Sequence, residues 1–443
     1  MSSGAVVVLI LVFTFAGCAS PPAPPAASEP GEQPARVTLP TGQIMTVDEL
    51  RPGMTGYGLT VFEGTKPERF GVEIISVLRN YDPQADMILI RCSGHNLEKT
   101  GIAAGMSGSP IYIDDKLIGA LAYGWRFSVE PIAGVQPIER MLANSGLRAD
   151  LPPPRQEVLP EAQARGGPAA PAGRSTRPFA ALAQRQSAFA RLAGKARAAG
   201  PVPGKPAAGS ADRRAGGALA PLAVPLVVSG GSQAAMDYLT DRLKGTGFVP
   251  VRSGGAGGQD PRTGQARMEP GATLTIPLLA GDMDAAVLGT VTTVIGDRVL
   301  AFGHPMWGEG PVNLPMATGV VHAFIPSIAE SFKMGSAGKV IGAVRRDESA
   351  SICGVIGQEP YMTPMTVRVK HWTGVEKTYH YRVVDEWYFS ARMTGGALIA
   401  SIADGSIEPL ELTVSYRGVV RFKGFEPYRF SGTARSQIGR AHV

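Results

Sequence analysis

The stretch that decides the fold is Gly105–Pro110, which reads GMSGSP and is followed by the apolar run IGALAYGW at Ile118–Trp125. A serine hydroxyl is a weak nucleophile unless a sharp turn presents its Oγ to a base and nearby amides to the developing oxyanion. Glycines on both sides of Ser107 permit such a turn. Ser107 is therefore the candidate nucleophile, and the backbone N–H groups of Gly105 and Ser107 are the candidate oxyanion donors. The alternative is an ordinary turn in a chain with 56 glycines and 37 prolines.

The run after the turn predicts a strand that an extended substrate can pair with. Its last residues, Ala122, Tyr123 and Gly124, are the candidate substrate strand, because a peptide binds an exposed strand edge through main-chain hydrogen bonds. Strand-like runs separated by Gly, Asp and Pro fill residues 58–123, and Asp114-Asp115 predicts a hairpin turn. Residues 37–145 thus predict a small β unit that bears the serine.

A base for this serine is expected within hydrogen-bond reach. His304 is the first candidate, because it ends a strand, Gly-Asp turn and strand pattern over residues 287–303. His95 is the rival, since it belongs to the same β unit as Ser107. His322 lies in an apolar alternation and is interpreted as a core residue. His371 and His380 are interpreted as surface residues.

Residues 100–111, with Lys116–Ala120, closely resemble the SpoIVB-type sporulation serine peptidases of the chymotrypsin-like clan. The sequence around Phe302–Pro305, with residues 325–327, 335–338 and 341–344, resembles the other half of the same domain. The resemblance implies a mainly β fold made of two chymotrypsin-like β-barrel halves. Here the halves are in permuted order, with a small α/β insert and a disordered linker between them.

The resemblance also implies a third catalytic residue, an Asp upstream of the nucleophile. That position falls at Ser93 or Cys92 in this chain, and neither supplies a carboxylate. Asp347, 43 residues after His304, is a substitute candidate. The alternatives are a solvated turn at Asp347 and a Ser/His dyad without a third member. Gly101, at the place of a charged specificity residue, predicts a small or apolar side chain before the cleaved bond, and Met106 argues against activation by insertion of a new N-terminus.

The chain of 443 residues is long enough for several domains, and its basic character is local. Residues 148–217 carry twelve Lys or Arg and four Asp or Glu, an excess larger than the net charge of +6 of the whole chain. The charge therefore belongs to a linker, and we expect no nucleic-acid partner. Within this linker, residues 179–192 have near-helical apolar spacing, which favours a transient helix over a helix that contacts lipid.

The N-terminus predicts export. An apolar run at residues 5–16 precedes Cys18, which fits a lipoprotein signal with acylation of Cys18, and a plain secretory signal is the alternative. We expect the protein at the periplasmic face of a bacterial membrane, held there by the lipid anchor. Cys92 and Cys353, both in strand-like runs, are interpreted as buried thiols.

The organisation follows from these segments. We expect a signal peptide (1–18), a disordered tether (19–36), the Ser-bearing unit (37–145), a disordered Ala/Pro/Gly linker (146–218), a small α/β segment (219–267), the His-bearing unit (268–380) and a further strand-rich segment (381–437). Residues 438–443 are expected to be a non-native tail, with the natural chain continuing differently.

Three functions are compatible with this sequence. The first is an exported serine endopeptidase that acts on a protein or peptide substrate through an acyl-enzyme, with a regulatory or self-processing role. The second is a catalytically inactive, peptide-binding module of the cell envelope with the same fold. The third, a purely structural lipoprotein, leaves the serine turn unexplained. We expect no cofactor and no metal ion.

Overall fold

The computed structural model describes residues 5–13, 43–82, 85–145, 219–254, 261–308, 310–371, 374–404, 411–421 and 425–437. Cys18, the tether 19–36, the linker 146–218 and the tail 438–443 lie outside these ranges. The strands of the described residues outnumber the helices, so the predicted mainly β fold class is confirmed.

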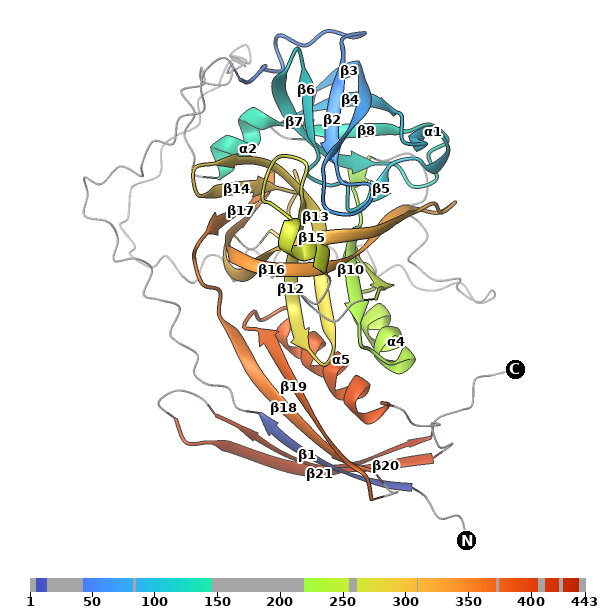
Figure 1. Ribbon diagram of the computed structural model, residues 1–443, viewed down its shortest axis with the longest axis vertical. Coiled ribbons are helices and arrows are strands. Elements are labelled where there is room, and N and C mark those ends of the chain that lie inside the picture. The colour runs from blue at the N-terminus through green and yellow to red at the C-terminus, as the bar shows by residue number, and fades with distance from the viewer. Residues whose placement is uncertain are drawn as a thin grey trace, which may run out of the picture. The chain divides into compact units, whose positions relative to one another are not determined.

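The first β unit is a closed antiparallel barrel (Figure 1). Its strands are β2 (Thr55–Thr60), β3 (Glu68–Asp82), β4 (Ala85–Ser93), β6 (Pro110–Ile113), β7 (Lys116–Gly124) and β8 (Ile132–Pro137). They pair in the order β2-β3-β4-β8-β7-β6, and β6 pairs with β2 to close the circuit. The expected hairpin turn lies between β6 and β7, with φ of 49° at Asp114 and 58° at Asp115. The short helices α1 (Leu97–Thr100) and α2 (Ile138–Asn144) flank the barrel.

The second β unit closes in the same way. Its strands are β12 (Thr273–Gly281), β13 (Asp284–Ile295), β14 (Arg298–Ala301), β15 (Gly310–Ile325), β16 (Ser331–Glu348) and β17 (Ser351–Ile356). The pairing order β12-β13-β14-β17-β16-β15 returns to β12, and every pairing is antiparallel. Both barrels thus follow one connectivity, in which the third strand pairs with the sixth and the fourth with the first. The two chymotrypsin-like halves predicted from the sequence are confirmed, with the serine half first.

The small α/β segment packs beside the second barrel. Strands β10 (Val224–Ser229) and β11 (Phe248–Arg252) are parallel and are connected through helix α4 (Gln233–Arg242). The Ser232 side chain accepts a hydrogen bond from the N–H of Ala235, as expected for an N-cap. Strand β10 also pairs with β13, so this segment extends the sheet of the second barrel. A 3₁₀ helix, η1 (Pro261–Gln265), precedes β12.

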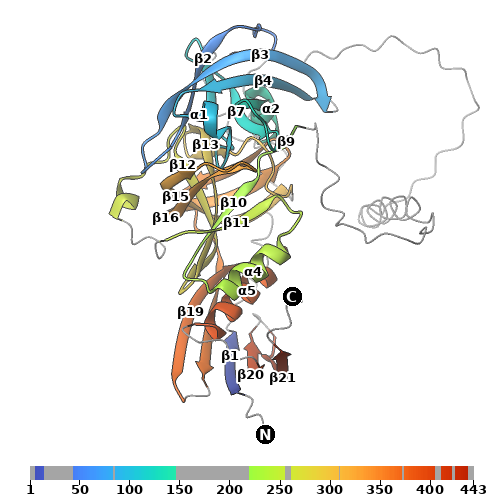
Figure 2. The same ribbon diagram turned by 90° about the vertical axis from the view of Figure 1, so that its right-hand side faces the viewer.

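The segment after residue 380 contains a helix that the strand-rich prediction did not include. It is α5 (Ser390–Ile402), and it packs on α4 (Figure 2). The two glycines that weaken its helical propensity also allow the close contact, because a Cβ at Gly395 would collide with the Tyr238 hydroxyl. Tertiary packing therefore stabilises a helix that local sequence does not favour.

The remaining strands extend the sheet of the second barrel or pair with a single strand of either barrel. The extension runs β12-β19-β18-β1-β20-β21, with bounds β18 (Met362–Lys370), β19 (Glu376–Val384), β1 (Ala5–Phe13), β20 (Glu411–Val420) and β21 (Tyr428–Gln437). Two short strands complete the set: β5 (Ala103–Ala104) pairs with β16, and β9 (Ala220–Pro221) pairs with β7. The apolar run inside the predicted signal peptide is thus a strand here. In the described ranges no helix is long and apolar enough to cross a membrane.

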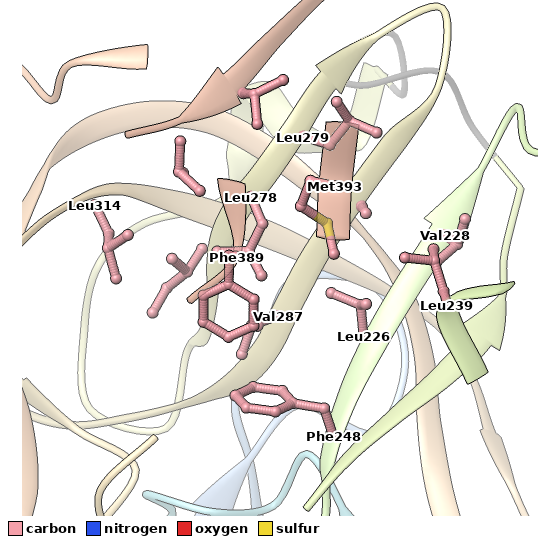
Figure 3. Packing of buried hydrophobic residues seen from close by; sticks show 14 of the residues in the cluster. Leu226, Val228, Leu239, Phe248, Leu278, Leu279, Val287, Leu314, Phe389 and Met393 are labelled. Carbon is pink, nitrogen blue, oxygen red and sulfur yellow. The ribbon is translucent and has the colours of Figure 1, made fainter. Parts of the chain in front are cut away.

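The largest core cluster joins the α/β segment to the second barrel. Phe248 of β11 meets Phe389, which precedes α5, in an edge-to-face contact with ring centroids 5.2 Å apart (Figure 3). Another cluster contains residues of both barrels, including Leu117 and Met141 from the first and Leu300 from the second. The barrels therefore share buried apolar surface, which stabilises their association.

Two predictions about single residues have clear outcomes. Cys92 and Cys353 are free and buried, as expected, and burial raises the pKa of both thiols. His380 is exposed, as predicted. The same prediction is wrong for His371, which is only 8% exposed. The His371 backbone N–H donates to the carbonyl of Val375.

Candidate active site

The serine turn is held in a conformation that depends on glycine. Gly105 and Gly108 have φ of 93° and 96°, in the region that other residues rarely adopt. A Cβ at Gly108 would collide with the carbonyl oxygen of Thr290 and would lie 2.5 Å from the N of Phe302. The glycine after the nucleophile therefore allows the turn to lie directly against the second barrel.

Strand β13 of the second barrel holds this turn by three hydrogen bonds. The Thr290 N–H donates to the Ser107 carbonyl (2.8 Å), and the Thr290 hydroxyl donates to the Gly105 carbonyl (2.9 Å). The Thr292 hydroxyl donates to the Gly108 carbonyl (2.8 Å). Because these carbonyls all accept bonds from one strand, the peptide planes around Ser107 have fixed orientations.

Ser107 and His304 meet across the barrel interface. The Ser107 Oγ lies 2.9 Å from the His304 Nε2, although 197 positions separate the residues. The ring's other nitrogen, Nδ1, lies 2.8 Å from the carbonyl oxygen of Pro305. A carbonyl oxygen can only accept, so Nδ1 carries the proton and Nε2 is left to accept from the serine hydroxyl. This is the tautomer that a general base requires.

The two residues occupy equivalent places in the two barrels. Ser107 lies between β4 and β6, the third and fourth strands of its barrel, and His304 lies between β14 and β15, the third and fourth of the other. Asp347 lies at the end of β16, the fifth strand of the His-bearing barrel. The shared connectivity therefore brings the serine and histidine turns face to face.

Both members of the pair are almost completely buried. Ser107 is 2% exposed and His304 is 1% exposed. Burial lowers the pKa of His304 to about 4, and its hydrogen bond to the Pro305 carbonyl offsets a smaller part of that effect. The imidazole is consequently neutral at neutral pH and able to take a proton. Charging it in this closed environment is costly.

Asp347 supports the loop after His304. One carboxylate oxygen accepts the Met306 N–H (2.8 Å), and the other accepts the N–H groups of Trp307 and Gly308 (both 2.9 Å). The Pro305 carbonyl that orients the imidazole belongs to the same loop. The solvated turn considered for Asp347 is wrong, because the residue is only 1% exposed. These three hydrogen bonds all come from the backbone of the loop.

The predicted oxyanion donors lie in a turn whose other amides are already used. The N–H groups of Met106, Gly108 and Ser109 donate to the carbonyls of Ala103, Leu121 and Met106. The predicted donors, Gly105 and Ser107, are the other two residues of this turn. Their role stays a prediction.

The predicted substrate strand lies at the open end of β7. Tyr123 and Gly124 pair antiparallel with β9, and the Ala122 carbonyl accepts the N–H of Leu222 at 2.9 Å. A cavity of about 340 Å³ adjoins this edge, and Gly101, Gly124 and Trp125 are among its lining residues. Gly101 and Gly124 thus line the same cavity, and the small or apolar side chain before the cleaved bond stays a prediction.

His95, the alternative candidate for the base, makes its contacts with residues other than Ser107. The His95 ring stacks on Phe62, with centroids 4.0 Å apart, and its Nε2 lies 3.0 Å from the Arg69 carbonyl. His322, interpreted as a core residue, is partly exposed, and its Nδ1 lies 3.0 Å from Arg262. Among the described residues, no group of three or more His, Cys, Asp or Glu side chains is placed to hold a metal ion.

Several residues that support the serine turn were not predicted from the sequence. Besides Thr290 and Thr292, these include Lys333, which is fully buried and whose Nζ donates to the Thr60 hydroxyl at 2.5 Å. Burial lowers the pKa of Lys333 to about 7. The two threonines alternate on one face of an apolar strand, and the lysine is alone in a run of apolar and small residues. Both were visible signals of buried polar roles.

Two closed antiparallel barrels that join a serine and a histidine in one buried hydrogen bond define the class of double-barrel serine peptidases. The family model described as SpoIVB peptidase S55 matches residues 36–142. This match agrees with the resemblance of the serine turn to that family; it covers the Ser-bearing barrel and ends before His304. Neither the curated proteins nor the solved structures gave a match.

Proposed function

We propose that the protein is an exported serine endopeptidase of SpoIVB type, with Ser107 as nucleophile and His304 as base. The observation that carries the proposal is the 2.9 Å contact between Ser107 Oγ and His304 Nε2, formed by two turns from different barrels. The family match at residues 36–142 supports peptidase chemistry. The Pro305 carbonyl supports the base role, since it fixes the required tautomer.

The chemistry follows from this arrangement. His304 Nε2 takes the hydroxyl proton while Ser107 Oγ forms a bond to the carbonyl carbon of the substrate. The N–H groups of Gly105 and Ser107 stabilise the oxyanion. The intermediate then collapses, the C–N bond breaks, and the imidazolium gives its proton to the leaving amine. Water attacks the acyl-enzyme by the same proton transfers and frees Ser107.

The test is reaction with a fluorophosphonate probe, which phosphonylates an activated serine. The full chain should be labelled, and Ser107→Ala and His304→Ala should abolish labelling. Ser93→Ala and His380→Ala are matched controls, because both residues are exposed whereas Ser107 and His304 are buried. Equal labelling of all five proteins would reject the proposal.

A second candidate is a peptide-binding module that has the fold without the chemistry. It is favoured by the low pKa of His304, about 4, because a base that resists protonation in this closed site is a poor proton acceptor. In that case the unmodified chain would not be labelled, yet peptides would bind along Ala122–Gly124.

The cellular setting is part of the proposal. The apolar N-terminus and Cys18 support export and lipid anchoring at the periplasmic face of a membrane. A regulatory or self-processing role is proposed from the family resemblance.

A further inference from the structure

The edge of the proposed substrate strand is occupied by the chain itself. Ala220 pairs with Gly124 and Pro221 with Tyr123, in antiparallel register. One residue further on, the Leu222 N–H donates to the Ala122 carbonyl. A peptide substrate binds a strand edge through this kind of main-chain pairing. Pro221, which is opposite Tyr123, has no N–H and donates no hydrogen bond to the strand.

In this segment two buried leucines flank two exposed residues. Leu219 and Leu222 are 8% and 7% exposed, whereas Ala220 and Pro221 point to solvent. Leu222 lies against Gly124, since a Cβ there would be 2.9 Å from its Cδ2, and it lines the same cavity as Gly101. Upstream, the Tyr81 hydroxyl donates to the Leu219 carbonyl at 3.2 Å. Residues 219–222 are therefore held against the barrel by two buried leucines and by main-chain bonds.

The anchored end lies beside the Ser107/His304 pair. The carbonyl of Leu121, next to Ala122, accepts the N–H of Gly108 at 2.8 Å. Ala122 also approaches the residue before His304, because a Cβ at Gly303 would be 3.0 Å from the Ala122 Cβ. Leu222 is thus paired with the strand residue that adjoins both turns of the site.

After Leu222 the chain leaves the site. The Ala223 N–H donates to a carboxylate oxygen of Glu330 at 3.3 Å. If the bond between Leu222 and Ala223 were the cleaved bond of a substrate, the Ala223 nitrogen would have to receive a proton from His304 Nε2. An N–H held by Glu330 is directed to a different partner, so this conformation resembles a bound inhibitor more than a substrate under attack.

We propose that Leu219–Leu222 is an internal ligand of the substrate strand, which keeps the site closed and mimics the substrates that replace it. The proposal rests on the proposed function for the role of the strand. The substrate class is then an extended segment with a leucine-sized apolar residue opposite Ala122. The residue before it can be proline, because no N–H is required at that position. Displacement of residues 219–222 opens the edge of β7.

Peptide binding tests this inference without catalysis. In a Ser107→Ala background, a fluorescein-labelled acetyl-Leu-Ala-Pro-Leu-amide peptide is titrated against the full chain and followed by anisotropy. Leu222→Asp puts a charge into the apolar contact, so the internal segment detaches and the peptide should bind about tenfold more tightly or better. Tyr81→Phe, a milder change at the other anchor, should strengthen peptide binding by a few-fold.

The matched control is Ala220→Asp, which adds the same charge to the same segment at an exposed side chain. It should leave peptide binding unchanged. Fluorophosphonate labelling of the same variants with Ser107 intact separates this inference from the proposed function. Faster labelling of Leu222→Asp supports both, and tighter peptide binding without any labelling supports the internal ligand and rejects the peptidase.

Two results would overturn the inference. In the first, the peptide binds the Leu222→Asp and Tyr81→Phe variants no better than the parent, although circular dichroism shows that they are folded. In the second, Ala220→Asp strengthens binding as much as Leu222→Asp does, because the buried anchors then have no special role.

Discussion

Asp347→Asn is the most informative single change, since it keeps the shape of the side chain and removes its charge. The carboxylate accepts three backbone N–H groups from Met306, Trp307 and Gly308, and the residue is 1% exposed. Asparagine keeps only one of the two accepting oxygens. Its NH₂ group then faces a backbone N–H that the lost oxygen accepted, and two donors cannot form a hydrogen bond. A hydrogen bond to a charged group contributes about 1.5–3 kcal/mol, so the variant should lose about 3 kcal/mol of unfolding free energy.

Urea unfolding followed by tryptophan fluorescence measures this loss, and Glu348→Gln is the matched control. Glu348 is the neighbouring carboxylate on β16 and pairs at 2.7 Å with Arg346, whose side chain is 46% exposed; removing this pair should cost less than about 1 kcal/mol. Fluorophosphonate labelling of Asp347→Asn should also fall, by about tenfold, because the loop that orients His304 loosens. The pH of half-maximal labelling should stay the same, since Asp347 acts through the backbone. Unchanged stability together with unchanged labelling would refute the reasoning.

Three other predictions follow from charge and processing. Labelling should persist on acidification until the pH approaches about 4, which is the lowered pKa of His304. Between pH about 4 and 6.5 the unfolded chain binds a proton at His304 that the folded chain does not bind. The free energy of unfolding should therefore rise with pH across that window. The free energy of unfolding should rise a second time between pH about 7 and 10.5, because there the lysine is protonated in the unfolded chain and has lost its proton when buried. Lys333→Met should remove this second rise. Urea midpoints measured against pH report both rises. If Cys18 is acylated, mass spectrometry should find it as the first residue of the membrane-bound protein, and Cys18→Ala should move the protein to the soluble fraction.

The barrels could be predicted largely because their hairpins are local. The Asp114-Asp115 turn, the apolar runs of β3, β4 and β7 and the glycines around Ser107 each specify structure over a few residues. Strand β8 has no such signal, since Ile132–Pro137 reads IAGVQP; its place is decided by the need to close the barrel between β4 and β7. Helix α5 was missed for a similar reason, because its glycines are favourable only in contact with α4.

In the site, the Ser107/His304 pair could be predicted from the sequence, whereas the hydrogen bonds of Asp347 could not. Ser107 and His304 lie in recognisable turns. The three hydrogen bonds that Asp347 accepts come from a loop that lies 39 to 41 residues earlier in the chain, and no local pattern predicts them. The occupation of β7 by Leu219–Leu222 is also invisible in the sequence. Leu219–Pro221 reads LAP and follows a linker of similar composition, and only the pairing with Tyr123 and Gly124 distinguishes it.

The reversed order of the two halves leads to a last prediction, because the contacts that join them do not depend on the linker. Besides the three bonds to the serine turn, Gly64 and Val321 exchange backbone hydrogen bonds of 2.8 and 2.9 Å, and Ser331 donates to the Thr100 carbonyl at 2.5 Å. These bonds and the shared apolar cluster should hold the barrels together in a chain cut once within residues 146–218. A cleavage site for a specific protease, inserted there, provides the cut. Size-exclusion chromatography should then show one complex with fluorophosphonate labelling equal to that of the uncut chain, whereas separate fragments would show that the linker itself holds Ser107 against His304.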